Sequence, residues 1–311
     1  MIKLILNNNS QCETTLESTV KQVVWNMKNT PFIKIEGMDL KKKYKYIKVI
    51  NENIKLFSGE VLVEDSKFSI KFDLESPLDK TDAIKVILDE EEYIFDIKLR
   101  KIYGTVRYIN EKPVKNPIIS CTNSNIISIG DEDGNFEILL SDKEESIGIF
   151  DHRYSKDMLE TWIYNVDLDK DVKLDIHIDK CEVYGIRSFK QYCSYYMNFI
   201  PMSIDRVNYV ENKGLKSEVE IAIDEDFSPK LRVEDVEVYC NNKKLEIVSF
   251  TEVKDFLGNI EGKNRYRNGY ILAVPKSSID DSLIKIKIKD NFLENEYTNV
   301  GIGEGYCFLN K

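Results

Sequence analysis

The chain has 311 residues and a formal net charge of −10. At about 100–200 residues per domain, this length predicts two or three domains, and a content of 42% hydrophobic and 32% charged residues favours globular folding over disorder. The acidic balance argues against general nucleic-acid binding, which needs a positive field, and no apolar run reaches the ~18 residues of a membrane span.

The densest basic run is KKKYKYIK, residues 41–48. Its tyrosines alternate with lysines, as on surfaces that bind single-stranded nucleic acid. The alternative is an edge strand with one solvated lysine face, since lysines discourage edge pairing. The acidic residues around the run favour the edge strand, so we expect no nucleic-acid partner.

The N-terminus and the cysteines both suggest a reducing compartment. MIKLIL is too short for the apolar region of a signal peptide, although a mature form that has lost its signal would look the same. The six cysteines lie apart, without zinc-ribbon spacing, which favours buried thiols over a disulfide such as Cys181–Cys193. We expect a cytoplasmic protein that is available for incorporation into a larger assembly or a virion.

Residues 1–98 suggest a β domain with one helix. TTLE, residues 14–17, fits a helix capping box, and Leu16, Val20, Val23, Val24 and Met27 follow at helical spacing, which predicts an amphipathic helix over residues 14–28. We expect it to pack on its own domain rather than on a partner. From residue 32 the pattern changes to short alternating runs separated by turn residues, which is typical of a sandwich or barrel. In one run, 68–74, the residues Phe68, Ile70, Phe72 and Leu74 share a buried face.

Residues 99–180 carry motifs of a second unit. Gly104-Thr-Val106, Lys112-Pro113-Val114 and Asn116-Pro117-Ile118 are followed by Asp131, Gly134 and Phe136. This series resembles the carboxypeptidase regulatory-like domain, in which a G-x-V strand, a Pro-Val turn and a D-x-x-G-x-F corner occur in this order. The resemblance implies a transthyretin-like β-sandwich. The chain departs from the family at Gly130, where the family usually has Thr or Ser.

The acidic stretch SIGDEDGNFEILL, residues 128–140, could form a corner or bind calcium. In the corner, Asp131 accepts backbone N–H groups, Gly134 reverses the chain and Phe136 anchors it in the core. An EF-hand loop needs Gly at position 6, but counting from Asp131 this position is Phe136. The corner is therefore favoured, and Asp131 with Asp133 remains a lesser calcium candidate of another type.

The chain offers few groups for catalysis. Its two histidines, His152 and His177, lie in the apparent accessory domain, and no H-x-x-E, H-E-x-x-H, G-x-S-x-G, Walker A or G-x-G-x-x-G motif occurs. The run GIGEG, 301–305, lies too near the C-terminus to precede a phosphate-binding helix. A carboxylate pair of the glycosidase type stays open, because 54 acidic residues are available and none is singled out. We expect no enzyme, no cofactor and no metal.

Residues 181–311 suggest a third β unit with a weak immunoglobulin-like pattern. Near its start, the aromatic residues Tyr192, Tyr195, Tyr196 and Phe199 form a candidate binding surface, since tyrosine offers a flat apolar ring with a polar end. The alternative is that alternate members belong to the core and the others cover a domain joint.

These observations predict a mostly β protein of tandem β-sandwich modules, Ig-like or transthyretin-like, divided as 1–98, 99–180 and 181–311. The function expected first is a non-catalytic structural or protein-interaction role, or self-assembly, in a bacterial or phage assembly. The second is binding to carbohydrate or a cell surface through Tyr192–Phe199. The third is a carboxylate-based hydrolase.

Overall fold

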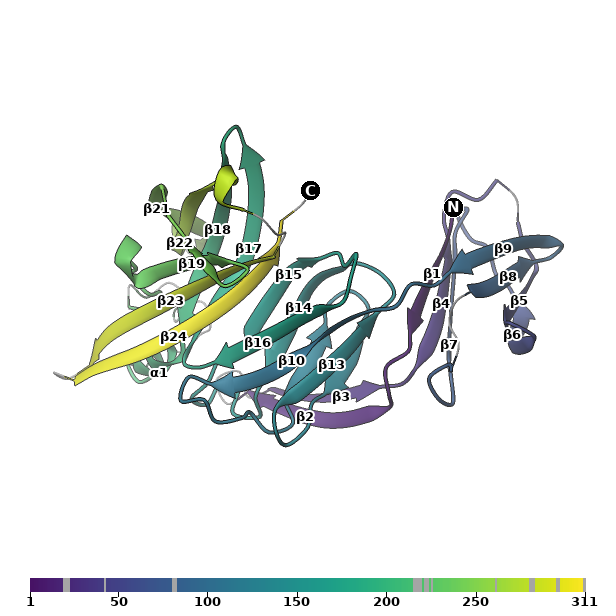
Figure 1. Cartoon of the computed structure of the whole chain (residues 1–311), viewed down its shortest axis with the longest axis horizontal. Coiled ribbons are helices and arrows are strands. Elements are labelled where there is room, and N and C mark those ends of the chain that lie inside the picture. Colours follow the sequence, from purple (N-terminus) through teal and green to yellow (C-terminus); the bar gives the residue numbers. More distant parts are fainter. Residues whose placement is uncertain are drawn as a thin grey trace.

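The computed structural model in Figure 1 describes the whole chain except residues 19–22, 42, 80–82, 215–219, 221–223, 225, 261, 280–282, 295–296 and 310–311. The fold is mostly β, with several sheets arranged around three main hydrophobic cores, and the short helix α1 (Ile204–Glu211). None of the described helices has the length and apolar character needed to cross a membrane.

The N-terminal core lies between two sheets. One has the strand order β1 (Ile2–Asn7), β4 (Phe32–Gly37), β7 (Phe68–Asp73), and the other the order β6 (Ile54–Glu60), β5 (Tyr46–Asn51), β8 (Ala83–Leu88), β9 (Glu91–Asp96). Alternate residues of each strand point inward, because successive side chains in a strand face opposite sides. Phe68, Ile70, Phe72 and Leu74 all pack on this core, which confirms their predicted common face.

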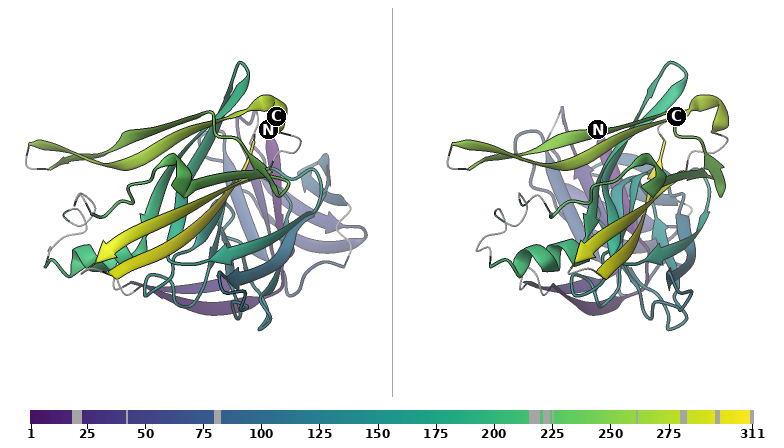
Figure 2. Two further views of the ribbon diagram at one scale, coloured as in Figure 1. Left: turned by 60° about the vertical axis from the view of Figure 1, so that its left-hand side comes forward. Right: turned by 90° about the vertical axis from the view of Figure 1, so that its left-hand side faces the viewer.

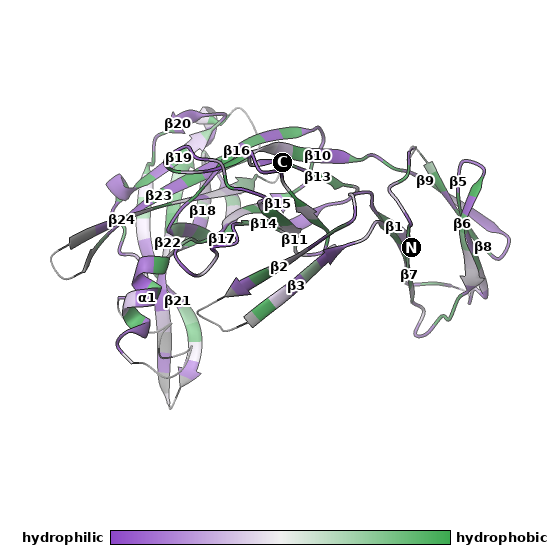
Figure 3. Ribbon diagram, turned by 90° about the horizontal axis from the view of Figure 1, so that it is seen from below, coloured by the Kyte–Doolittle hydropathy of each residue, from purple (hydrophilic) through white to green (hydrophobic). Residues whose placement is uncertain are grey.

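The predicted helix over residues 14–28 is wrong. Its described residues form the antiparallel hairpin β2 (Cys12–Ser18) and β3 (Val23–Asn29). The hairpin leaves its own core and lies along the middle part of the molecule (Figure 3). There Leu16 is buried against Ile118 and Ile127. Residues with β-branched side chains favour strands, and the apolar partners come from about 100 residues away, so local spacing could not reveal them.

The basic run 41–48 also differs from the prediction. Its strand, β5, is not an edge strand, because it pairs with β6 on one side and β8 on the other. Tyr44 is buried and its hydroxyl donates to Glu91, 2.7 Å away. The run therefore does not present alternating free rings to a nucleic acid.

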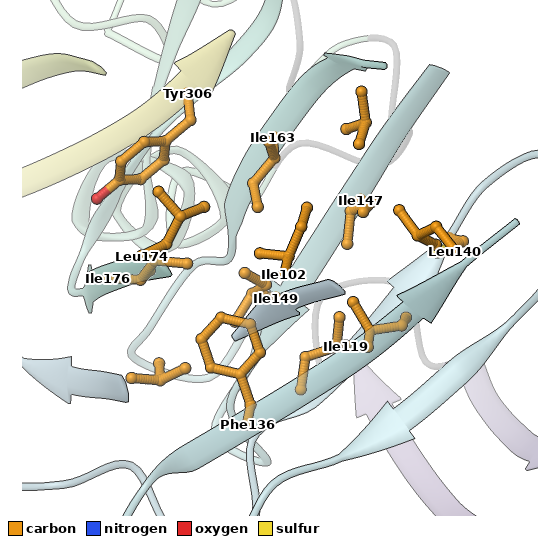
Figure 4. Close-up of a cluster of buried hydrophobic side chains, with 14 of the residues drawn as sticks. Ile102, Ile119, Phe136, Leu140, Ile147, Ile149, Ile163, Leu174, Ile176 and Tyr306 are labelled. Carbon is orange, nitrogen blue, oxygen red and sulfur yellow. The ribbon is translucent and has the colours of Figure 1, made fainter. Parts of the chain in front are cut away.

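The middle core also lies between two sheets. The first has the order β13 (Asn135–Leu140), β10 (Arg100–Tyr108), β16 (Val172–Ile178), and the second begins with β12 (Ile127–Ile129), β11 (Ile118–Cys121), β14 (Glu144–Phe150), β15 (Thr161–Val166). Isoleucines fill much of the space between them (Figure 4). Gly104 has φ +152°, and a Cβ there would lie 1.9 Å from the carbonyl oxygen of Leu174, so only glycine allows β10 and β16 to pair here.

The C-terminal core is enclosed by longer strands. One sheet has the order β17 (Cys181–Gln191), β18 (Ser194–Ser203), β22 (Lys263–Pro275), β21 (Ser249–Ile260). Facing it are β24 (Tyr297–Phe308), β23 (Leu283–Glu294), β19 (Val236–Cys240) and β20 (Lys243–Leu245). The 3-10 turns Val233–Asp235 and Lys276–Ser278 precede β19 and follow β22.

The middle and C-terminal cores share one sheet. Strand β24, the last of the chain, pairs in parallel with β15, so the strands from β12 to β20 form a continuous eight-stranded sheet. Tyr306 of β24 points into the middle core (Figure 4), as does Phe308, whereas Cys307 between them belongs to the C-terminal core. One face of the sheet thus closes the middle core and the opposite face closes the C-terminal core.

The glycines of the GIGEG run serve this packing. A Cβ on Gly303 would lie 2.7 Å from the backbone carbon of Cys181, and a Cβ on Gly305 would lie 2.8 Å from the Cβ of Val183. Strand β17 therefore crosses β24 at backbone contact distance, which side chains on these glycines would prevent. The run is a packing element of β24.

Buried asparagines join the N-terminal and middle parts. The side-chain amide of Asn9 pairs with the backbone of Leu139 in both directions, each at 2.8 Å. Asn29 donates to the carbonyl of Ser10 at 2.8 Å and accepts from the N–H of Ile127 at 3.3 Å. These amides satisfy strand-edge backbone groups that would otherwise lose hydrogen bonds on burial.

Candidate functional site

Five aromatic side chains form a continuous strip of ring contacts between distant parts of the chain. The ring of Trp25 lies 6.2 Å from that of Tyr154, which lies 5.4 Å from Phe150. Phe150 lies 5.8 Å from Trp162, and Trp162 lies 6.1 Å from Tyr184. We call Trp25, Phe150, Tyr154, Trp162 and Tyr184 the aromatic strip.

The aromatic strip draws on every part of the molecule. Trp25 comes from the N-terminal hairpin, Phe150 and Trp162 from adjacent strands of the shared sheet, and Tyr184 from β17. The two ends are open to solvent, with Trp25 37% and Tyr184 39% exposed, while the three central rings are half-buried. Aromatic rings held in this way are typical of binding surfaces, because they offer apolar area at a small cost in side-chain entropy.

Glycine and an aspartate hold the strip in place. A Cβ on Gly148 would lie 2.6 Å from the ring of Phe150 and 3.0 Å from that of Trp162, so glycine lets the two rings meet. Asp151 is buried and accepts the hydroxyl of Tyr108 at 2.6 Å and the N–H of Arg153 at 3.1 Å. This carboxylate fixes the turn that carries Tyr154.

Two buried glutamates lie beside the strip. The indole N–H of Trp162 donates to Glu160 at 3.1 Å, which orients the ring. Burial raises the pKa of Tyr154, and the charges of Glu160 and Glu182 raise it further. The hydroxyl of Tyr164, whose pKa burial also raises, accepts the N–H of Gly185 at 2.7 Å. Tyr154 and Tyr164 are therefore neutral at physiological pH.

The four aromatic residues predicted as a surface take different places. Phe199 is 1% exposed in the C-terminal core, and Tyr195 packs against the same core. Tyr196 faces the other way and stacks on Phe189, with ring centroids 5.2 Å apart and planes 7° apart. Tyr192 lies at the hairpin turn and is 91% exposed. We call Phe189, Tyr192 and Tyr196 the hairpin patch.

The acidic stretch forms a compact turn. Asp131 accepts the backbone N–H groups of Asp133 at 3.0 Å and Asn135 at 2.8 Å. The hydrogen bond from the Asn135 side chain, at 2.9 Å, and then these backbone bonds lower the pKa of Asp131. Gly134 has φ +80°, and Phe136 is buried in the middle core. Gly130, the departure from the family motif, lies where a Cβ would be 2.7 Å from the ring of Pro117.

Within the described part of the chain, no three His, Cys, Asp or Glu side chains gather as they would around an ion. A cavity of about 740 Å³ is lined by residues that include Asn9, Asp131 and Asn135. A second, of about 530 Å³, lies between the β15–β16 loop and Asn241, with lysine and aspartate side chains mixed in its wall.

The cysteines form no disulfide. All six are free; Cys181 is buried at the β17–β24 crossing and Cys193 is exposed at the hairpin turn. Burial raises the pKa of the Cys181 thiol well above its usual value, which makes it unreactive.

The aromatic strip could not be predicted from the sequence. Its members lie in three separate stretches of the chain, and Trp25 was part of the segment predicted as a helix. The available signal was local: Phe150 and Tyr154 lie close to Trp162 in a stretch that also contains Tyr164. Only the tertiary contact of the β2–β3 hairpin completes the strip.

Comparisons with known proteins show little. No family model matches the chain, and no curated protein matches it. Three solved structures each share 10% identity with it: a candidate carbohydrate-binding protein from Bacteroides uniformis (68% of this chain and 99% of that chain, TM-score 0.21), a DUF3823 family protein from Bacteroides ovatus (68% and 100%, 0.20) and BcpA, the major pilin subunit of Bacillus cereus (68% and 70%, 0.21). These TM-scores are too low to support an argument about function.

Proposed function

We propose that the chain is a non-catalytic structural or protein-interaction protein of a larger bacterial or phage assembly, built of tandem β-sandwich modules. The boundaries after residues 98 and 180, and the carboxypeptidase regulatory-like and immunoglobulin-like assignments, are part of this proposal. The observation that carries it is the aromatic strip, whose rings come from all three parts of the chain and end in the exposed Trp25 and Tyr184. Aromatic residues of this kind dominate the binding energy of protein interfaces.

Rigidity supports the same role. Strand β24 belongs to both the middle and C-terminal cores, and the asparagine bonds join the N-terminal part to the middle one. The strip therefore keeps its shape without a partner, which lowers the entropy lost on binding.

The strip can be tested in a pull-down from the native organism with the immobilised chain. We expect any protein retained by the wild type to be lost with Trp25→Ala or Tyr184→Ala. Val24→Ala is the matched control, because Val24 neighbours Trp25 but is 56% exposed on the opposite side of β3. If both Trp25→Ala and Tyr184→Ala still retain the same proteins as the wild type, the proposal is contradicted.

Carbohydrate binding through the hairpin patch is the second candidate. Phe189 and Tyr196 lie nearly parallel, and Tyr192 is exposed at the turn of the same hairpin, so the hairpin offers flat rings to a sugar. A glycan array should give signals that Tyr192→Ala and Tyr196→Ala both remove. Binding that survives both substitutions, or no binding at all, would rule this candidate out.

A further inference from the structure

Strand β21 is the open edge of its sheet. The sheet runs β17-β18-β22-β21, and no described strand pairs with the second side of β21. With β22 it forms a long hairpin that projects from the C-terminal part (Figure 2). Open edges present unpaired N–H and C=O groups, which are templates for pairing with another strand.

The sequence along this edge is complementary to a second, antiparallel copy of itself. The segment FTEVKDF, residues 250–256, has phenylalanine at both ends and opposite charges, Glu252 and Lys254, on either side of Val253. In an antiparallel pair of two such strands centred on Val253, Phe250 faces the second copy's Phe256, and Glu252 faces the second copy's Lys254. Aromatic pairs and opposite charges across strands both stabilise such pairing.

The side chains are placed for this arrangement. Phe250, Glu252, Lys254 and Phe256 lie on one face of β21, since alternate residues of a strand share a face. Phe250 stacks on Tyr270 with centroids 5.1 Å apart, and Phe256 contacts Tyr266 at 5.6 Å while remaining 56% exposed. Both phenylalanine rings are thus positioned by β22 before any second copy arrives.

We propose that two copies of this chain associate through β21, antiparallel and with two-fold symmetry about Val253, so that the two four-stranded sheets become one. The inference rests on the proposed interaction role and names one of its partners, a second copy. Two-fold symmetry makes each contact occur twice. Charged side chains on an edge strand oppose its pairing with unrelated strands or in other registers. In the register centred on Val253, however, each charge of β21 lies opposite a charge of the other sign.

The association is expected to be weak. In the single chain Lys254 Nζ already lies 2.7 Å from Glu252 Oε1, so the two charges partly satisfy each other before they meet a second copy. The paired segment has seven residues and is about 20 Å long at about 3.4 Å per residue. Such a small interface suggests a dissociation constant on the order of 100 µM.

Sedimentation equilibrium of the full chain, from about 1 µM to about 1 mM, tests the proposal. We expect a monomer–dimer equilibrium that Lys254→Glu or Glu252→Lys weakens about tenfold or more, because each variant places like charges opposite each other twice. A mixture of the two single variants should form a heterodimer, since each cross-strand pair then joins one acidic and one basic side chain again. The double variant E252K/K254E should dimerise like the wild type.

Lys190→Glu on the exposed end of β17 is the control for net charge and should leave the dimer unchanged. A chain that stays monomeric at the highest concentration overturns the proposal. So does a dimer that both single variants leave intact, or single variants whose mixture fails to associate. Tyr184→Ala separates this outcome from the proposed function, because it should abolish capture through the aromatic strip and leave the dimer intact.

Discussion

Arg206 and Asp290 form an ion pair that is buried at both ends. The guanidinium donates to the carboxylate at 2.7 and 2.9 Å, and its third nitrogen donates to the carbonyl of Asp226 at 3.1 Å. The ring of Phe292 lies 4.6 Å from the guanidinium carbon. The pair fastens α1 to β23, at a place where the removal of one charge would leave the other unpaired in a region of low polarity.

Asp290→Ala should therefore destabilise the C-terminal part strongly. Loss of one partner of a buried pair costs about 3–5 kcal/mol in the free energy of unfolding. Urea denaturation would measure it. The control is Asp157→Ala, which removes the partner of Arg153 in a pair whose two side chains are about half exposed. Similar losses in both variants would show that burial does not set the cost.

His177 belongs to a charged group at the joint between the middle and C-terminal parts. Its Nδ1 lies 3.6 Å from Glu304, which is buried and also accepts the hydroxyl of Tyr306 at 2.8 Å. Glu304 and, less strongly, Glu111 raise the pKa of His177 above its usual 6.5. Burial alone would raise the pKa of Glu304, but His177 and Lys285 outweigh it and the pKa falls below the usual 4.5.

This group should make stability depend on pH. The raised pKa of His177 contributes stability that is complete below its unfolded value of 6.5 and is lost as the pH rises through the folded value. The lowered pKa of Glu304 contributes above 4.5 and is lost as the pH falls. The stability difference between wild type and His177→Gln should be larger at about pH 5.5 than at about pH 8.5. His152→Gln is the control; a difference independent of pH would contradict this assignment.

At the scale of elements, the crossing of β17 over β24 depends on glycine. Gly303→Ala would place a methyl group 2.7 Å from the backbone carbon and 2.8 Å from the oxygen of Cys181, and neither can move without shifting a strand. We expect a loss of about 1–3 kcal/mol, the usual cost of overpacking, in thermal or urea unfolding. Gly269→Ala is the control, because its nearest neighbours would lie 3.4 Å away. A tolerated Gly303→Ala would mean that the crossing is looser than described.

Sequence patterns predicted many of the strands, but they did not predict which strands pack against one another. The alternation of residues 68–74 predicted a buried face because half-buried strands repeat every two residues. The same logic failed for residues 14–28, where Met27 fits the predicted helical stripe and also shares a strand face with Trp25. What decides between them is the apolar surface of Ile118 and Ile127, which lies far along the chain.

At the scale of the whole molecule, the candidate site depends on contacts of long range. Among the four aromatic residues predicted as a surface, Phe199 points inward and Tyr196 points outward, because successive residues of a strand face opposite sides. The sequence had already suggested the alternative that some of the four belong to the core. The aromatic strip lay beyond prediction, because Trp25 meets Tyr154 only after the N-terminal hairpin docks on the middle part. The sequence could therefore predict candidate site residues that lie within one segment. It could not predict a site whose residues come together from several segments.

The shared sheet predicts that the middle and C-terminal parts unfold together. Phe308 lies on the last strand but is buried in the middle core, so Phe308→Ala should cost about 3–5 kcal/mol. Hydrogen exchange should show lost protection in β14 and β15 as well as in β23, because β24 joins them in one sheet. Ile35→Ala, a matched core deletion in the N-terminal part, should reduce protection mainly in β1, β4 and β7. Loss confined to the middle strands β14 and β15 after Phe308→Ala, with β23 unaffected, would show that the two cores are independent, because a continuous sheet transmits the loss of a buried side chain to both of the cores that it closes.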